Sequence, residues 1–211
     1  MQFPNAYEGV KKIYKAEILA IIAAICLVIV GILALVVAAS ESAGAAVGVL
    51  IFGLAAAVLA IIAFIMNIVG VGRASKDEPA FKTALYALII GIIASIVLGA
   101  FQSSNALISG LGSTVSKVME FLASYYICTG IINLADKLND AAVSEKGKKV
   151  RTMLIVVWII SAVVGLISGI VNSGAVSVIG GILAIIAAIL AIIAYIMYLG
   201  LLSKAKKMLE Q

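Results

Sequence analysis

The chain has 211 residues, of which 64% are hydrophobic and 12% are charged. Soluble domains average about 45–50% apolar and about 25% charged residues, so this composition excludes a soluble globular protein and indicates a membrane protein. The net charge of +5 does not indicate a nucleic-acid-binding protein, because the cations lie near the ends of apolar runs and form no patch interleaved with aromatic residues.

Residues 1–17 predict an amphipathic helix that lies in the membrane interface. Phe3, Tyr7, Val10 and Tyr14 recur at helical spacing and line one side, whereas three lysines fall away from that side. Such a helix buries its apolar side at the boundary between headgroups and acyl chains. A frayed hydrophilic terminus is the alternative.

Six apolar runs then follow, each close to the roughly 20 residues that cross a hydrocarbon core of about 30 Å. They are Ile18–Ala39, Val47–Val71, Ala84–Phe101, Val118–Leu134, Met153–Val171 and Gly181–Leu202. Only the fourth run contains a charge, Glu120 near its start. We therefore expect an all-α polytopic membrane protein with six transmembrane helices.

The connectors differ in character along the chain. Ser40–Gly44 is a short polar turn, Arg73–Lys82 is charged and contains a helix-ending Pro79, and Gln102–Ser116 is rich in Ser and Gly. After the fourth run the helical pattern continues through Asp140, and we expect Gly147 to break it. The turn at 172–174 reverses the chain before the last run.

The cations predict the orientation. Every Lys and Arg except Lys117 falls before the first run, after the last run or in the connectors on that same side. Because positively charged loops are retained in the cytoplasm, we expect a multi-pass protein of the plasma (inner) membrane. Both termini are then cytoplasmic, and residues 204–211 form a short cytoplasmic tail.

An eight-residue segment occurs twice. Leu190–Met197 repeats Leu59–Met66 with one change, Tyr195 in place of Phe64, and Tyr126–Cys128 is a weaker third copy. Each copy is followed by a glycine, at positions 70, 130 and 200. The alternative to a true internal repeat is chance similarity between sequences rich in Ala, Ile and Leu. This alternative is stronger for the short third copy than for the two long copies.

The repeat predicts how the spans pair. Consecutive spans form three hairpins, at residues 18–72, 83–140 and 151–203, and each hairpin enters and leaves on the same side. The repeats are therefore parallel and not inverted. We expect one membrane domain over residues 1–211, built from three parallel helical hairpins.

Small residues recur every four positions on two spans. Such stripes let helix backbones approach closely where lipid removes the hydrophobic drive between helices. The residues are Gly91, Ser95 and Gly99 on the third span and Ser161, Gly165 and Gly169 on the fifth. We interpret both stripes as packing within the bundle, with a homodimer face as the alternative.

The three hairpins, the glycine-bearing spans and the aromatic-then-glycine pattern before the basic residues resemble the HdeD-type family of small bacterial inner-membrane proteins. The resemblance covers the whole chain at the level of architecture. It implies an inner-membrane protein associated with acid stress.

Polar side chains within the spans are the functional leads, because polar groups in hydrocarbon usually face protein or water. The candidate polar track consists of Asn67, Tyr126, Thr129, Asn133 and Asp136. Lys117 and Glu120 are three residues apart near the outer end and are expected to neutralise each other. The track is either a path for a small solute or ion, or a set of interhelical hydrogen bonds.

Composition argues against catalysis and metal binding. The chain contains no His, the commonest metal ligand and general base. Cys26 and Cys128 lie inside hydrophobic runs, where cysteine is usually a small buried apolar side chain. We therefore predict no metal site, no cofactor and no enzymatic activity.

Two functions remain open from the sequence. The first is a structural or accessory membrane bundle, either self-associating as a homo-oligomer or part of a larger membrane assembly. The alternative is a small transporter or channel for a small solute or ion. Membrane lipids are the expected surroundings in both cases, and nucleic acid is not an expected partner.

Overall fold

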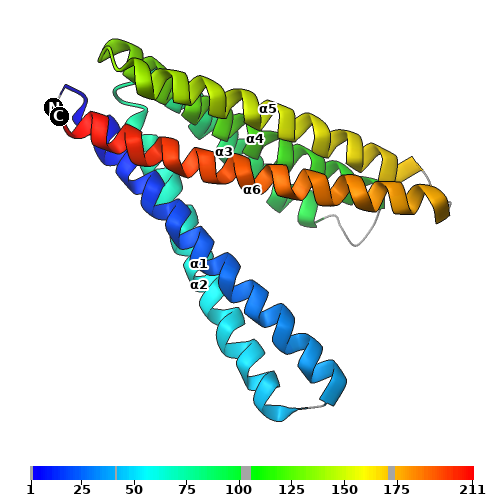
Figure 1. Ribbon diagram of the computed structural model, residues 1–211. Coiled ribbons are helices and arrows are strands. Elements are labelled where there is room, and N and C mark those ends of the chain that lie inside the picture. The colour runs from blue at the N-terminus through cyan, green and yellow to red at the C-terminus, as the bar shows by residue number, and fades with distance from the viewer. Residues whose placement is uncertain (1, 41, 101–105, 171–173) are drawn as a thin grey trace.

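The computed structural model describes residues 2–40, 42–100, 106–170 and 174–211, and within these it consists of six α-helices (Figure 1). The helices are α1 (Pro4–Ser40), α2 (Ala43–Ala74), α3 (Pro79–Ala100), α4 (Ala106–Lys137), α5 (Ala141–Ile170) and α6 (Gly174–Glu210). Helices suit this composition because hydrocarbon leaves no water to pair with the backbone. The all-helical fold is as predicted.

Five of the helices are long and apolar enough to cross a membrane within the described parts of the chain. They are α1, α2, α3, α4 and α6, and the qualifying stretches of α3, α4 and α6 are Pro79–Val97, Thr114–Lys137 and Leu183–Glu210. The predicted fifth span, 153–171, lies on α5 and ends beyond the residues whose side chains are described. The chain is therefore a helical membrane protein.

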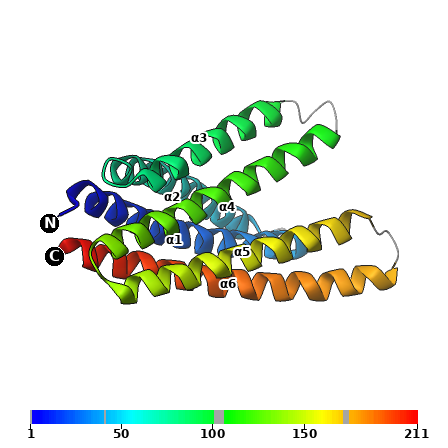
Figure 2. The same ribbon diagram turned by 90° about the horizontal axis from the view of Figure 1, so that it is seen from above.

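Consecutive helices pack as pairs. The most extensive packing joins α1 with α2 and α3 with α4, whereas α5 packs about equally on α4 and on α6. Smaller interfaces join α1 with α6 and α2 with α3. Figures 1 and 2 show the three pairs converging at the end that holds both termini and diverging toward the other end. We call these the basic end and the far end, because the lysine-rich segments lie at the former.

The hydrophobic core lies at the basic end. Its largest fully buried side chains include Ile13, Phe81, Ile131, Leu134 and Leu201, each of which is completely inaccessible to solvent. α1 has 37 residues, about 55 Å at 1.5 Å per residue, so it exceeds a hydrocarbon core of about 30 Å by about 25 Å. α1 is therefore long enough to cross the hydrocarbon and to contribute its first turns to the core at the basic end.

The far halves of the helices expose apolar side chains instead. Leu35 is 73% exposed, Leu50 is 71% exposed and Leu54 is 70% exposed, and all three lie on α1 or α2. In lipid this exposure costs little, because acyl chains are as apolar as leucine and no hydrophobic force drives helices together. We therefore expect lipid to cover the exposed side chains where the pairs diverge.

Residues 4–17 are not a separate interfacial helix. They form the first turns of α1, which runs without interruption from Pro4 to Ser40. Tyr7, Val10 and Ile13 are buried against the ends of the other helices. The amphipathic pattern was read correctly, but its apolar side packs on protein.

The break expected at Gly147 lies instead at residues 138–140. α4 ends at Lys137 and α5 begins at Ala141. Asn139 has φ of 55°, a left-handed conformation that ends helices, and the Asp140 carboxylate accepts a hydrogen bond from the Val143 amide at 3.0 Å. Gly147 lies inside α5, where a Cβ would come within 2.5 Å of Ile132 Cγ1, so this glycine provides close packing and not a break.

Two other helix starts differ from expectation. α4 begins at Ala106, so most of the connector predicted at 102–116 is helical, and residues 101–105 are not described. Pro79 is the first residue of α3, a position where its missing amide hydrogen costs nothing. Within the predicted polar turn, Ser42 caps α2 by accepting a hydrogen bond from the Ala45 amide at 3.4 Å.

The three repeat glycines occupy comparable places. Each lies on the second helix of a pair, near the basic end, and faces the first helix of the same pair. A Cβ on Gly70 would meet Gly9 O at 2.8 Å and Ile13 Cγ1 at 2.9 Å, and one on Gly130 would meet the Phe81 ring at 2.6 Å. One on Gly200 would meet a lysine, as described below.

Candidate functional site

A cavity lies between the helix pairs, just beyond the core. It has two lobes of about 480 and 360 Å³, and both lobes are lined by Glu17, Phe64, Asn67 and Glu120. The larger lobe extends along α3 and α4 and the smaller lobe extends between α1 and α2. Ligand sites typically have volumes of about 300–1,000 Å³, so each lobe can hold a small molecule.

Glu17 is the centre of the polar groups in this cavity. Its carboxylate accepts a hydrogen bond from the Tyr195 hydroxyl at 2.9 Å and a long one from Asn67 Nδ2 at 3.5 Å. The Tyr195 hydroxyl also lies 3.2 Å from the Glu17 carbonyl oxygen. Helices α1, α2 and α6 therefore meet at one carboxylate, at the residue immediately before the charge-free run of α1.

The hydroxyl that binds Glu17 comes from the one position where the two long repeat copies differ. Phe64 and Tyr195 occupy equivalent repeat positions. Phe64 presents its ring to the cavity, whereas Tyr195 adds a donor that reaches Glu17. The same register of the repeat thus supplies an apolar wall on α2 and a polar contact on α6.

The ionisable side chains that line the cavity include two carboxyl groups. Glu17 and Glu120 both line it, and no Lys or Arg does so among the described residues. The ion pairs of the described residues are Arg73 with Glu8 and Lys137 with Glu78, and none of these four residues lines the cavity. Asn67 Oδ1 is buried and accepts no hydrogen bond from any described residue. Hydroxyl groups of Ser95, Ser116, Ser124 and Tyr198 also line the larger lobe. Because the acidic groups in the lining are not matched by basic ones, the arrangement favours a cation or a hydrogen-bond donor.

The charge pair predicted for Lys117 and Glu120 is not formed in the described structure. Both side chains are exposed, and Glu120 faces the cavity instead. A spacing of three residues allows contact on a helix but does not require it, and here the cavity leaves Glu120 room to turn away.

The predicted polar track is divided between two places. Asn67 lies at the cavity, while Asn133 lies at the basic end, where its Nδ2 donates to Glu78 Oε1 at 2.8 Å. Thr129 donates to the Tyr125 carbonyl oxygen at 2.9 Å and lies 3.5 Å from an Arg151 guanidinium nitrogen. The track is therefore not continuous.

The remaining two members of the track have other surroundings. Tyr126 packs against the core and meets the Tyr125 ring edge-on at 5.4 Å between centroids. Asp136 is exposed near the turn between α4 and α5. Neither residue reaches the cavity.

Glu78 is the buried carboxylate of the basic end. It is 4% exposed, and it accepts hydrogen bonds from Asn133 and, at 2.6 Å, from Lys137 Nζ. Burial alone would raise the pKa of this carboxyl, but the hydrogen bonds from Asn133 and Lys137 and the charge of Lys137 outweigh it and lower the pKa. Glu78 therefore links the start of α3 to α4, and we assign it a role in stabilising the fold.

The small-residue stripe on α3 packs within its own pair. A Cβ on Gly91 would lie 3.1 Å from Met119 Cβ, and Ser95 Oγ shares a hydrogen bond with Ser116 Oγ at 2.7 Å. On α5, Ser161 is exposed. Gly99, Gly165 and Gly169 lie outside the residues whose side chains are described.

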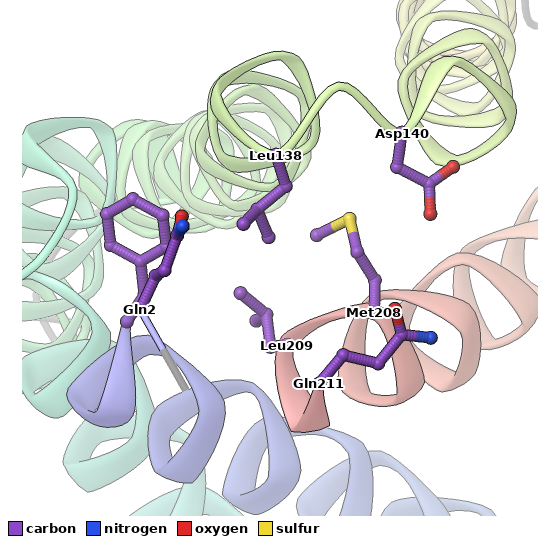
Figure 3. Close-up of a pocket in the computed structure, with 7 residues that line it drawn as sticks. Gln2, Leu138, Asp140, Met208, Leu209 and Gln211 are labelled. Carbon is purple, nitrogen blue, oxygen red and sulfur yellow. The ribbon is translucent and has the colours of Figure 1, made fainter.

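A second, smaller cavity lies at the termini (Figure 3). It measures about 180 Å³ and is lined by Gln2 and Phe3 just before α1, by the turn between α4 and α5, and by the C-terminal end of the chain. Leu138, Met208 and Leu209 point into it, with Asp140 and Gln211 at its rim. Since Asp140 already caps α5, we regard this cavity as a gap between helix ends.

Sequence reasoning missed Glu17, and it assigned Glu120 to a different role. Glu17 stands one residue before an apolar run, directly after a lysine-rich segment, so it resembles an ordinary interfacial charge. Its partner Tyr195 lies 178 residues away. The only available signal was that Tyr195 differs from Phe64 in an otherwise preserved repeat.

Fold and site together define the class: an all-helical membrane protein with an acidic cavity between its helix pairs. The chain matches no family model, no curated protein and no solved structure.

Proposed function

We propose that this protein binds a small cationic solute in the cavity between its helix pairs and carries it across the membrane. The single observation that supports this is the pair of carboxylates, Glu17 and Glu120, in a cavity that no described cation lines. An ionisable residue within a membrane domain is costly and usually marks a pathway for an ion or solute.

The cavity also suggests the kind of cation. Its larger lobe is lined by Phe64, Leu88 and Ile92 in addition to the carboxylates. An organic ammonium or guanidinium ion can place its charge near Glu17 and its hydrocarbon against these side chains. A fully hydrated metal ion gains nothing from the apolar wall.

Transport in proteoliposomes tests the proposal. We expect wild-type protein to accelerate entry of labelled guanidinium or methylguanidinium, both of which can donate hydrogen bonds to the carboxylates, with labelled glucose as the neutral control. The double variant Glu17→Gln, Glu120→Gln keeps the side-chain shapes and removes both charges. It should lower the rate at least tenfold, since hydrogen bonds to charged groups contribute about 1.5–3 kcal/mol and 1.4 kcal/mol is tenfold.

Glu145→Gln is the matched control, because Glu145 is exposed on α5 away from the cavity. We expect it to transport at the wild-type rate. If wild-type vesicles take up neither cation faster than protein-free vesicles, the proposal is wrong.

A structural or accessory role is the second candidate. It is favoured by the exposed apolar surface of α1 and α2 at the far end, which another copy or a larger assembly could cover. Light scattering of the detergent-solubilised protein tests it. A strict monomer that co-purifies with no other protein would exclude this role.

For the membrane arrangement we propose six transmembrane helices as three parallel hairpins in the plasma membrane, with cytoplasmic termini. The one-sided distribution of cations and the comparable places of the three repeat glycines support it. The resemblance to the HdeD-type family stays a prediction that agrees with this arrangement.

A further inference from the structure

The third repeat glycine faces a different kind of side chain from the other two. Ile13 lies against Gly70 and Phe81 against Gly130, and both side chains are fully buried. Against Gly200 lies Lys146, whose Nζ is 2.6 Å from the position that a Cβ would take. In the α1–α2 and α3–α4 pairs a hydrophobic side chain packs against the repeat glycine. Between α5 and α6 an ammonium group packs there instead.

A second lysine stands beside this ammonium group. Lys204 lies one helical turn after Gly200 on α6, so it shares the face that Lys146 contacts. Burial and, after it, the positive charge of Lys204 lower the pKa of Lys146. Neither lysine belongs to an ion pair in the described chain, where only Arg73 with Glu8 and Lys137 with Glu78 are paired.

Two neighbouring ammonium groups without a counter-ion repel each other, so the pair gains from any anion placed between them. Lys146 on α5 and Lys204 on α6 thus form a two-sided basic site.

The depth of the site matches lipid headgroups. Tyr195 contacts Glu17, which directly precedes the charge-free run of α1. Gly200 is five residues further toward the basic end, about 7.5 Å along the helix axis. The headgroup layer extends about 5–8 Å beyond the hydrocarbon on each side. With the edge of the hydrocarbon taken at Glu17, the Lys146 ammonium falls within this layer.

We propose that the α5–α6 pair binds the phosphate of an anionic phospholipid between Lys146 and Lys204, with Gly200 making room for the Lys146 side chain. The lipid is favoured over free phosphate because the exposed apolar side chains of α6 below the site, Ile192 and Ile196 among them, can contact its acyl chains. This inference is independent of the transport proposed above.

Thermal unfolding in detergent tests the proposal, because a ligand that binds the folded state stabilises it. Phosphatidylglycerol, phosphatidylcholine and sodium phosphate are added at equal concentrations. We expect phosphatidylglycerol to raise the midpoint clearly more than the other two. Equal effects of the two lipids, or the full effect from phosphate alone, would overturn the proposal.

Variants locate the site. Lys146→Ala with Lys204→Ala should weaken phosphatidylglycerol binding about 25-fold, about fivefold per lysine. Lys76→Ala removes an exposed charge from the same end of the molecule and should change binding less than twofold. A Lys76→Ala loss equal to that of the double variant would mean that only net charge matters.

Gly200→Ala gives a test without any change of charge. The new Cβ displaces the end of a flexible lysine side chain, so the fold should be kept while binding falls severalfold. Unchanged binding by a folded Gly200→Ala protein would show that the Lys146 position against α6 is irrelevant.

Discussion

Replacing Glu78 with Ala tests whether one buried carboxylate holds the basic end together. Glu78 lies between α2 and α3 and accepts hydrogen bonds from Asn133 at 2.8 Å and Lys137 at 2.6 Å, both on α4. With 4% of its surface exposed, no water can replace the lost carboxylate fully. Asn133 Nδ2 then loses its partner in a largely buried site.

The expected cost follows from the two partners. A hydrogen bond to a buried charged group contributes about 1.5–3 kcal/mol, and we take about 2 kcal/mol for Asn133. The Lys137 side chain is 48% exposed, so solvent screens its ion pair to about 0.5–1 kcal/mol. Glu78→Ala should therefore lower the free energy of unfolding by about 2.5–3 kcal/mol.

Unfolding in mixed dodecylmaltoside and dodecylsulfate micelles, followed by circular dichroism, measures this change. Glu145→Ala removes an exposed carboxylate from α5 and should alter stability by less than about 0.5 kcal/mol. A loss below about 0.5 kcal/mol for Glu78→Ala would refute the reasoning, because the carboxylate would then be solvated or differently placed.

The same site predicts a pH dependence. The pKa of Glu78 is held below its ordinary value of 4.5, so near that pH the unfolded chain binds more protons than the folded one. The stabilisation is then fully present above about pH 5 and is lost as the pH falls through the lowered pKa. The difference in stability between wild type and Glu78→Gln should shrink below pH 4.5, and a constant difference would contradict this.

Three further predictions concern packing and topology. Gly9→Ala should lower the free energy of unfolding by at least about 2 kcal/mol, because the new Cβ would lie 2.5 Å from Gly70 O. Gly53→Ala should leave this free energy unchanged or raise it by up to about 1 kcal/mol, because the new Cβ would meet nothing within 4 Å. Phe81→Ala should lower the free energy of unfolding by about 3–5 kcal/mol. Leu35 is 73% exposed, so Leu35→Ala should lower it by less than about 0.5 kcal/mol in lipid, and denaturation of the two variants measures the difference. A cysteine at Ser42 should react only with reagents added outside intact cells, and labelling from the cytosol alone would invert the proposed orientation.

Helix content and approximate helix positions could be predicted because both depend on local composition. Apolar runs of about 20 residues transfer favourably into hydrocarbon as helices, and the structure has a helix over each of them. Helix ends were less accurate: the turn lies at Asn139 and not at Gly147. A glycine packed against Ile132 and a glycine that ends a helix look alike in sequence.

The candidate site could be predicted only in part. Asn67 was selected because it is polar within an apolar run, and it does line the cavity. Thr129 and Asp136 share a helix face with Asn133 in sequence, but only Asn133 meets a carboxylate. Helical spacing shows which residues share a face, whereas the neighbour of that face depends on how other helices pack.

The sequence by itself determined the membrane class, the helices and the collection of cations at one end, because each of these is a sum of short-range solvation preferences. Only the tertiary structure decided that Glu17 meets Tyr195 across 178 residues and that the core lies at the basic end. Those contacts depend on the rotation and divergence of the helix pairs, and the spacing of residues along one helix does not show which other helix will pack on a given face.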